Sequence, residues 1–174
     1  MKKSFAVSCW LFLAFFLSAQ LCYAERKPEM KCSVSYFIKN YNQKADELML
    51  PKLTEKDVRH KSGEMETNQI FLTKFSVVTM VTNPGGKSLT SLMFNGVGDE
   101  TKLSGSMILA SVTNTIMAVE PFFSSGEINA IMKGLGFFGG IEDGKPRSVS
   151  MRGFKFSSIL NPTLGLMVGV DPAE

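Results

Sequence analysis

The sequence is poor in the residues that build most catalytic and cross-linked sites. Its 174 residues include 3 Cys, one His and one Trp. A His-based zinc site would need carboxylates or Cys32 to complete the ligand set around His60, which argues against zinc. No Gly-x-Ser-x-Gly elbow presents a serine nucleophile. No glycosylation sequon occurs, because Pro162 blocks the pattern at 161–163. We therefore predict a non-enzymatic protein without cofactor or metal, of bacterial rather than eukaryotic origin.

The first 24 residues have the pattern of a cleavable secretory signal peptide. Two lysines supply the positive start, residues 5–21 are apolar without charge, and Ala24 precedes the predicted cut. Cleavage leaves a single domain, 25–174, in which 17 Lys and Arg face 16 Asp and Glu, a net charge of +1. The most apolar stretch of the mature chain, 107–123, includes polar residues and is too short to span a membrane. We predict a periplasmic or secreted protein.

Disulfide bonds within the mature domain are excluded, because Cys32 is the one cysteine that survives the predicted cleavage. We predict a buried, inert thiol near the N-terminus, since no neighbouring base would activate it. The alternative is an intermolecular disulfide through Cys32. The sequence is therefore compatible with either a monomer or a homodimer.

The first half of the domain is predicted to form a helix followed by a hairpin. Apolar side chains recur every three or four positions over 33–50, which is typical of a helix with one buried face. The charged segment 52–68 has no consistent period, and we interpret it as an exposed mobile loop. Residues 69–82 and 89–97 have the composition of strands, and the Asn-Pro-Gly-Gly turn at 83–86 joins them.

Two helices and a second hairpin are predicted in the second half. Residues 106–119 are apolar on most sides and end before a proline, which predicts a helix. Ser124 and Glu127 have the spacing of a reciprocal cap that begins a third, short helix. Residues 148–159 and 164–170 are predicted to be the strands of the second hairpin.

The predicted order is therefore α-ββ-α-α-ββ, with about three helices and about four strands. We expect a two-layer α+β domain, in which a mainly antiparallel sheet of two β-hairpins packs its helices on one face. In the last strand Gly165 and Gly169 leave gaps between apolar residues. Such gaps usually mark a position where another backbone or a helix comes close. A bound ligand is the less common explanation.

Three short motifs are near-matches to nucleotide or nucleic-acid sites. Residues 85–88 end like a phosphate-binding loop, but a strand is predicted where the anion would need a helix. Residues 96–101 lack the third glycine of a dinucleotide-binding turn. Residues 152–156 begin like the aromatic strand of an RNA-recognition domain but then depart from it. Since the net charge is also close to zero, we predict no nucleic-acid partner.

A small binding module that contacts an envelope protein fits these features best. It would act as an inhibitor or in the manner of an immunity protein, by neutralising an enzyme or toxin. Mobile polar loops on a rigid sheet are common contact sites, and 52–68 and 95–105 are the expected loops. The candidate partner-binding residues in these loops are Arg59, His60, Asp99 and Glu100.

Two other functions remain open from the sequence. Ten Phe and ten Met in the mature chain would line the core of a carrier for an apolar small ligand or lipid. Met also fills irregular cores without any ligand. A hydrolase would use His60 with Asp57 or Glu55, because a single His can be enough for general acid or base catalysis.

Overall fold

The structure is a computed structural model that describes residues 27–99 and 101–173, so the predicted signal peptide lies outside the described residues. Its helices are α2 (Val34–Ala45), α3 (Lys102–Val119) and α4 (Ser125–Gly134), with a 3₁₀ turn at Glu55–Asp57. Its strands are β1 (Arg59–Lys61), β2 (Glu66–Thr73), β3 (Ser76–Thr82), β4 (Leu89–Gly96), β5 (Arg147–Met151), β6 (Phe154–Asn161) and β7 (Gly165–Pro172).

The strands form one antiparallel sheet of seven strands in the order β1-β2-β3-β4-β7-β6-β5. A four-stranded meander, β1-β2-β3-β4, and a three-stranded meander, β5-β6-β7, meet where β4 pairs with β7. The fold is of the predicted α+β class. The prediction of about four strands in the order α-ββ-α-α-ββ is wrong, because the described elements follow the order α-ββββ-α-α-βββ.

The first missed turn lies inside residues 69–82, which were predicted as one strand. The chain reverses at Lys74 and Phe75, so that Thr73 faces Ser76 and the segment forms the ends of β2 and β3. The Thr73 hydroxyl stabilises this turn, because it accepts a hydrogen bond from the Phe75 amide at 3.0 Å. Neither Gly nor Pro marks the reversal, and apolar residues continue on both sides of it.

The second missed turn lies inside residues 148–159. Arg152 and Gly153, with φ of 49° and 80°, join β5 to β6 in a two-residue turn. Arg152 did not predict this turn, because the first residue of a two-residue hairpin turn is usually Asn, Asp or Gly. The third difference from the prediction is β1, a short strand that pairs with β2 within the charged segment 52–68, where we predict a loop.

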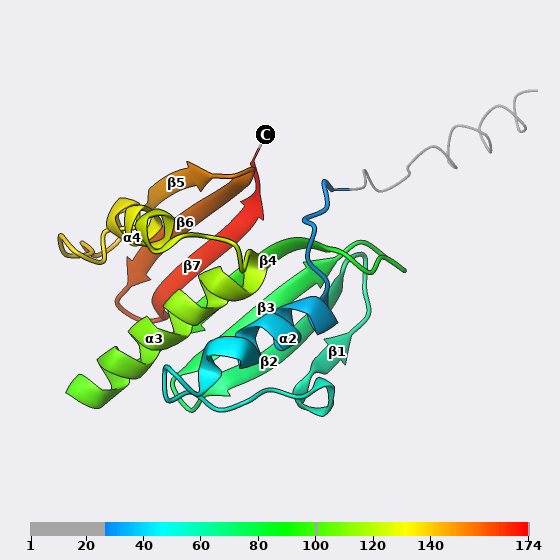
Figure 1. Ribbon diagram of the computed structural model, residues 1–174, viewed down its shortest axis with the longest axis horizontal. Coiled ribbons are helices and arrows are strands. Elements are labelled where there is room, and N and C mark those ends of the chain that lie inside the picture. Colours follow the sequence, from blue (N-terminus) through cyan, green and yellow to red (C-terminus); the bar gives the residue numbers. More distant parts are fainter. Residues whose placement is uncertain (1–26, 100, 174) are drawn as a thin grey trace, which may run out of the picture.

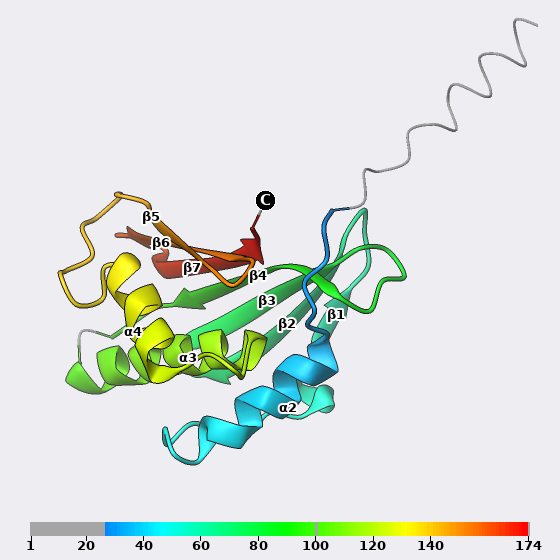
Figure 2. The same cartoon turned by 45° about the horizontal axis from the view of Figure 1, so that its top comes forward.

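All three helices lie on one side of the sheet, as Figures 1 and 2 show. The α2 and α3 helices pack against each other and exchange hydrogen bonds between side chain and backbone. Asn40 Nδ2 donates to the Ala118 carbonyl at 3.1 Å, and Asn114 Nδ2 donates to the Tyr41 carbonyl at 3.0 Å. The α4 helix packs on β5.

The core lies between the sheet and these helices. Residues of β2, β3, β4, β6 and β7 that point toward the helices are buried there, mostly at alternate positions, as the period of two in a strand requires. Its largest fully buried side chains come from both layers: Tyr41, Phe37, Phe94, Phe156, Ile70, Leu72, Met80, Leu89, Leu92, Ile116, Ile131 and Leu135. The core is thus filled by its own aromatic, aliphatic and Met side chains.

Side chains cap the two later helices. Ser124 Oγ accepts from the Glu127 amide at 3.3 Å and the Glu127 carboxylate accepts from the Ser124 amide at 2.8 Å, which confirms the predicted reciprocal cap. Thr101 Oγ1 accepts from the Ser104 amide at 3.1 Å and begins α3. In the part of the chain that the structure describes, no helix combines the length and apolar character of a membrane span.

Candidate functional site

The face of the sheet opposite the helices carries no helix of the described residues (Figure 2). We call this surface the open face. It consists of Thr67, Gln69 and Phe71 of β2, the odd-numbered residues of β3, β6 and β7, Ser91, Met93 and Asn95 of β4, the even-numbered residues of β5, and Arg59 and Lys61 of β1. Phe71 illustrates the alternation, because Ile70 and Leu72 on either side of it are fully buried under the helices, whereas 52% of Phe71 is exposed.

A row of apolar side chains crosses the open face. The register places Phe71 of β2 beside Val77 of β3, and Ile159 of β6 beside Met167 of β7. Asn95 of β4 lies between these two pairs. The four apolar residues are half-buried or exposed rather than buried. Solvent therefore reaches apolar side chains on both sides of Asn95 in the middle of the face.

A hollow of about 320 Å³ lies beside this row, over β4, β7 and β6. Gly169 lies at its centre, between Met93 of β4 and Ser157 of β6. Because Gly169 has no side chain, its neighbours surround a gap. The residues around the hollow include Ser91, Met93, Pro146, Ser157, Ile159, Met167, Gly169 and Asp171. The lining is mostly apolar, with serine hydroxyls and one carboxylate, that of Asp171. Such a lining suits the binding of a partly apolar group.

The two candidates of the first predicted loop point to opposite sides of β1. Arg59 lies on the open face, where its guanidinium carbon stands 5.1 Å from the centre of the Phe71 ring, within the range of a cation–π contact. His60 points the other way, where its ring nitrogens contact Asn68 Oδ1 at 3.0 Å and Ser62 Oγ at 3.2 Å. Strand geometry separates these neighbours, so they do not form one contact site.

The carboxylates considered as partners of His60 are engaged elsewhere. Asp57 accepts hydrogen bonds from the Thr54 amide and hydroxyl, both at 2.8 Å, and these bonds lower its pKa. Glu55 accepts a hydrogen bond from the Ser35 hydroxyl at 2.6 Å. In the described ranges 27–99 and 101–173, no three His, Cys, Asp or Glu side chains lie close enough to hold a metal ion.

In the second predicted loop, Asp99 organises the start of α3. Its carboxylate accepts from the Thr101 hydroxyl at 2.6 Å, and its amide donates to the Ser104 hydroxyl at 3.2 Å. The Thr101 hydroxyl, followed by that of Ser104, lowers the pKa of Asp99. Glu100 lies outside the described residues. Because β2 and β3 separate β1 from β4, the Asp99 loop and Arg59 lie on different parts of the sheet.

Cys32 is buried, with 2% of its surface exposed. The segment around it lies along the start of β4, since the Met30 amide donates to the Leu89 carbonyl and the Leu89 amide donates to the Cys32 carbonyl. Burial, followed by the nearby Glu120 carboxylate, raises the pKa of Cys32 to about 12. An intermolecular disulfide through this thiol would require the segment to open first.

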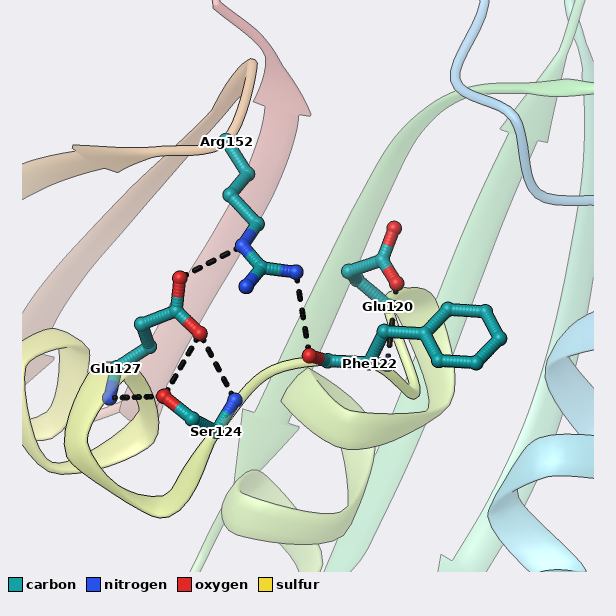
Figure 3. Close-up of polar contacts among 5 residues, drawn as sticks. All are labelled: Glu120, Phe122, Ser124, Glu127 and Arg152. Atoms are coloured by element: carbon teal, nitrogen blue, oxygen red, sulfur yellow. Dashed lines mark hydrogen bonds and ion pairs between the residues drawn. The ribbon is translucent and has the colours of Figure 1, made fainter.

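Arg152 joins the β5–β6 turn to the start of α4, a role that the sequence did not reveal (Figure 3). Its Nε donates to Glu127 Oε1 at 2.6 Å, and its Nη1 donates to the Phe122 carbonyl at 3.1 Å. Bonds from the Ser124 amide and hydroxyl, and then the contact with Arg152, lower the pKa of Glu127. The Glu120 carboxylate accepts from the Phe122 amide at 3.1 Å. These contacts fix the α3–α4 connection in place.

Comparison of the chain with protein-family models, curated proteins and solved structures found no match.

Proposed function

We propose that this chain is an exported, non-enzymatic binding module that docks a partner protein on the open face of its sheet. One observation carries the proposal. The helices cover one side of the sheet, and on the other side Phe71, Met93 and their apolar neighbours remain in contact with solvent. Large apolar side chains that remain exposed together on one face are typical of interaction sites.

The size of the open face supports a protein as the occupant. Seven strands give six spacings of about 4.8 Å, and thus a width of about 29 Å. A strand of eight residues, such as β2, is about 27 Å long. The area is therefore about 780 Å², close to the roughly 800 Å² that each partner contributes to an interface of standard size.

The distribution of charge narrows the chemistry of that partner. Arg59 and Lys61 lie at one edge of the open face, and Lys155 and Asp171 lie near its other side. The face thus has an excess of positive charge around an apolar centre. A complementary partner presents apolar residues bordered by acidic side chains, an arrangement that guides encounter and excludes wrong partners. An envelope enzyme or toxin with such a surface would be neutralised by this contact.

The partner is expected to bind at a different place from the two loops predicted from the sequence. Of the four candidate residues predicted from the sequence, Arg59 belongs to the open face. His60 lies on the opposite side of β1, and Asp99 holds the start of α3. The contact surface is therefore the sheet itself rather than the two loops.

Photo-crosslinking in cells that produce the protein tests this proposal with a matched control. A photoreactive benzoylphenylalanine replaces Met93 on the open face or Leu109 on α3. The two residues are exposed to almost the same degree, 42% and 41%, so they differ mainly in the layer on which they lie. We expect a product of one defined mass from position 93, and none from position 109.

The second arm of the experiment combines this crosslinker with changes on the face. Phe71→Asp and Arg59→Glu should each reduce the yield of the product at position 93, whereas Lys133→Glu on α4 should not. Equal products from positions 93 and 109, or a yield that Phe71→Asp leaves unchanged, would contradict docking on the open face.

A carrier of an apolar small ligand is the second candidate, and the hollow over Gly169 favours it. The core itself is filled, so a ligand would bind in this hollow on the opposite side of the sheet. Solvent extraction of the purified protein followed by mass spectrometry should then release a compound in stoichiometric amount. If no such compound appears, the carrier function is wrong.

A further inference from the structure

We infer that the hollow over Gly169 binds a cationic group on an apolar stem, such as the side chain of a Lys or Arg residue. The inference deepens the proposed function, since this hollow lies within the surface on which we propose that the partner docks. It names one contact that the partner makes there, and it rests on the geometry around three neighbouring strands.

The polar groups of the hollow converge on Gly169. A Cβ atom placed on Gly169 would lie 2.6 Å from Ser157 Oγ and 3.9 Å from Asp171 Oδ2. Ser157 Oγ therefore lies within the space that the missing side chain leaves, and Asp171 Oδ2 lies beside that space. Within residues 27–99 and 101–173, neither Ser157 Oγ nor the Asp171 carboxylate takes part in a hydrogen bond or an ion pair. Two acceptors, one of them charged, thus remain available to N–H donors.

The walls of the hollow are suited to an aliphatic stem. Met93, Met167 and Ile159 surround the gap, and their side chains contain no hydrogen-bond donor. Met side chains adapt their shape to the group that they contact. A volume of about 320 Å³ is at the lower end of the range for small-molecule sites, so it fits one extended side chain rather than a large ligand.

The sign of the charge follows from Asp171. An anion in the hollow would lie against this carboxylate, whereas an ammonium or guanidinium group would form a charge-assisted hydrogen bond with it. Lys155 is the register partner of Asp171 on β6, but its ammonium does not form an ion pair with Asp171. Lys155 therefore competes with an incoming cation without occupying the site.

Methyl NMR tests the inference without knowledge of the partner. The mature protein is labelled with ¹³C at the Met methyl groups, and Met93→Leu and Met167→Leu assign the two reporter signals. The probes are hexylammonium, hexanol and hexanoate, which share a stem and differ in charge. We expect hexylammonium to shift the signals of Met93 and Met167 at millimolar concentration, while the signal of the buried Met132 stays in place.

Substitutions then separate the charge from the stem. Asp171→Asn should weaken hexylammonium binding about fivefold, as expected for one exposed ion pair, and should leave hexanol binding unchanged. Lys155→Gln should strengthen hexylammonium binding, because it removes the competing cation. Glu64→Gln removes an acidic charge from an exposed loop and is the control, which should change nothing.

Two outcomes would overturn the inference. One is hexanoate binding as tightly as hexylammonium, and the other is the absence of any shift at Met93 and Met167. Either would leave docking on the open face intact, because that proposal depends on crosslinks at position 93. Conversely, the inference would survive if hexylammonium bound as described and the crosslinks failed to appear.

Discussion

Three Gly→Ala substitutions separate the strain of a left-handed backbone from the collision of a new side chain with a neighbouring strand. Gly153 and Gly165 have almost the same φ, 80° and 81°. A Cβ on Gly153 would have no atom within 4 Å, whereas a Cβ on Gly165 would collide with the carbonyl oxygen of Gly96 on β4. Gly169 has no positive φ, and its new Cβ would meet the Ser157 hydroxyl at 2.6 Å.

The expected costs differ because the causes differ. Gly153→Ala should lower the free energy of unfolding by about 1 kcal/mol, the cost of the left-handed conformation for a residue with a Cβ. Gly165→Ala should lower it by about 3 kcal/mol, because displacing the Gly96 carbonyl from the β4–β7 contact adds an overpacking cost. Gly169→Ala should change it by less than about 1 kcal/mol, since the Ser157 hydroxyl can rotate away.

Urea unfolding of the mature protein, followed by circular dichroism, measures all three. The urea concentration at the unfolding midpoint should be highest for Gly169→Ala, lower for Gly153→Ala and clearly lowest for Gly165→Ala. The slope of the unfolding free energy against urea concentration should stay the same. Equal midpoints for Gly153→Ala and Gly165→Ala would refute the close approach of β7 to β4 that the sequence already indicated at Gly165.

Three further predictions concern the side chains of Cys32, Arg152 and Asn114. The pKa of Cys32 is raised from 9.0 to about 12, so its contribution to stability is fully present below pH 9 and is lost as the pH rises toward 12. Urea unfolding at several pH values should therefore show a shallower alkaline loss for Cys32→Ala than for the wild type; an identical pH dependence would contradict this. Arg152→Ala should free the α3–α4 connection, and hydrogen exchange at residues 120–124 should accelerate while that of β7 does not; protection that remains at 120–124 would count against the joining role. Asn114→Leu should destabilise the fold by about 1 kcal/mol, because it removes the hydrogen bond that Asn114 Nδ2 donates to the buried Tyr41 carbonyl; a thermal unfolding curve like that of the wild type would exclude this.

Local signals in the sequence were sufficient for the helices. The reciprocal cap of Ser124 and Glu127 fixed the start of α4, because it depends on residues three positions apart. The apolar spacing located α2 but overran its end, since Ala45 is its last helical residue whereas the pattern continued to Leu50. The polar residues and glycine at 102–105 hid the first turn of α3, which a cap at Thr101 stabilises.

The sheet was harder to predict because the first position of each missed turn, Lys74 and Arg152, is not a residue that usually marks a turn. The turn at Lys74 is stabilised by the Thr73 hydroxyl, and the turn at Arg152 is anchored by Glu127 on a distant helix. β1 consists of exposed polar residues, and it exists because β2 offers it a free edge. A missed strand also hides which residues share a face. The sequence therefore did not show that Arg59 and His60 lie on opposite sides of the sheet.

For the candidate site too, local features could be predicted from the sequence, whereas features that depend on strand order could not. The gap at Gly169 was visible in the sequence, but the groups around it come from β4, β6 and β7 and depend on the strand order. The open face itself follows from two facts of tertiary structure, the number of strands and the packing of every described helix on one side. No spacing within the chain determines either of them.

Native mass spectrometry of the mature protein, taken without detergent from the compartment to which we propose it is exported, tests the central claim most directly. We expect a stoichiometric complex with a second protein that is lost in Met93→Asp and kept in Leu109→Asp, a control at a residue exposed to almost the same degree. A complex that survives Met93→Asp, or one that Leu109→Asp abolishes instead, would contradict the assignment of function to the open face.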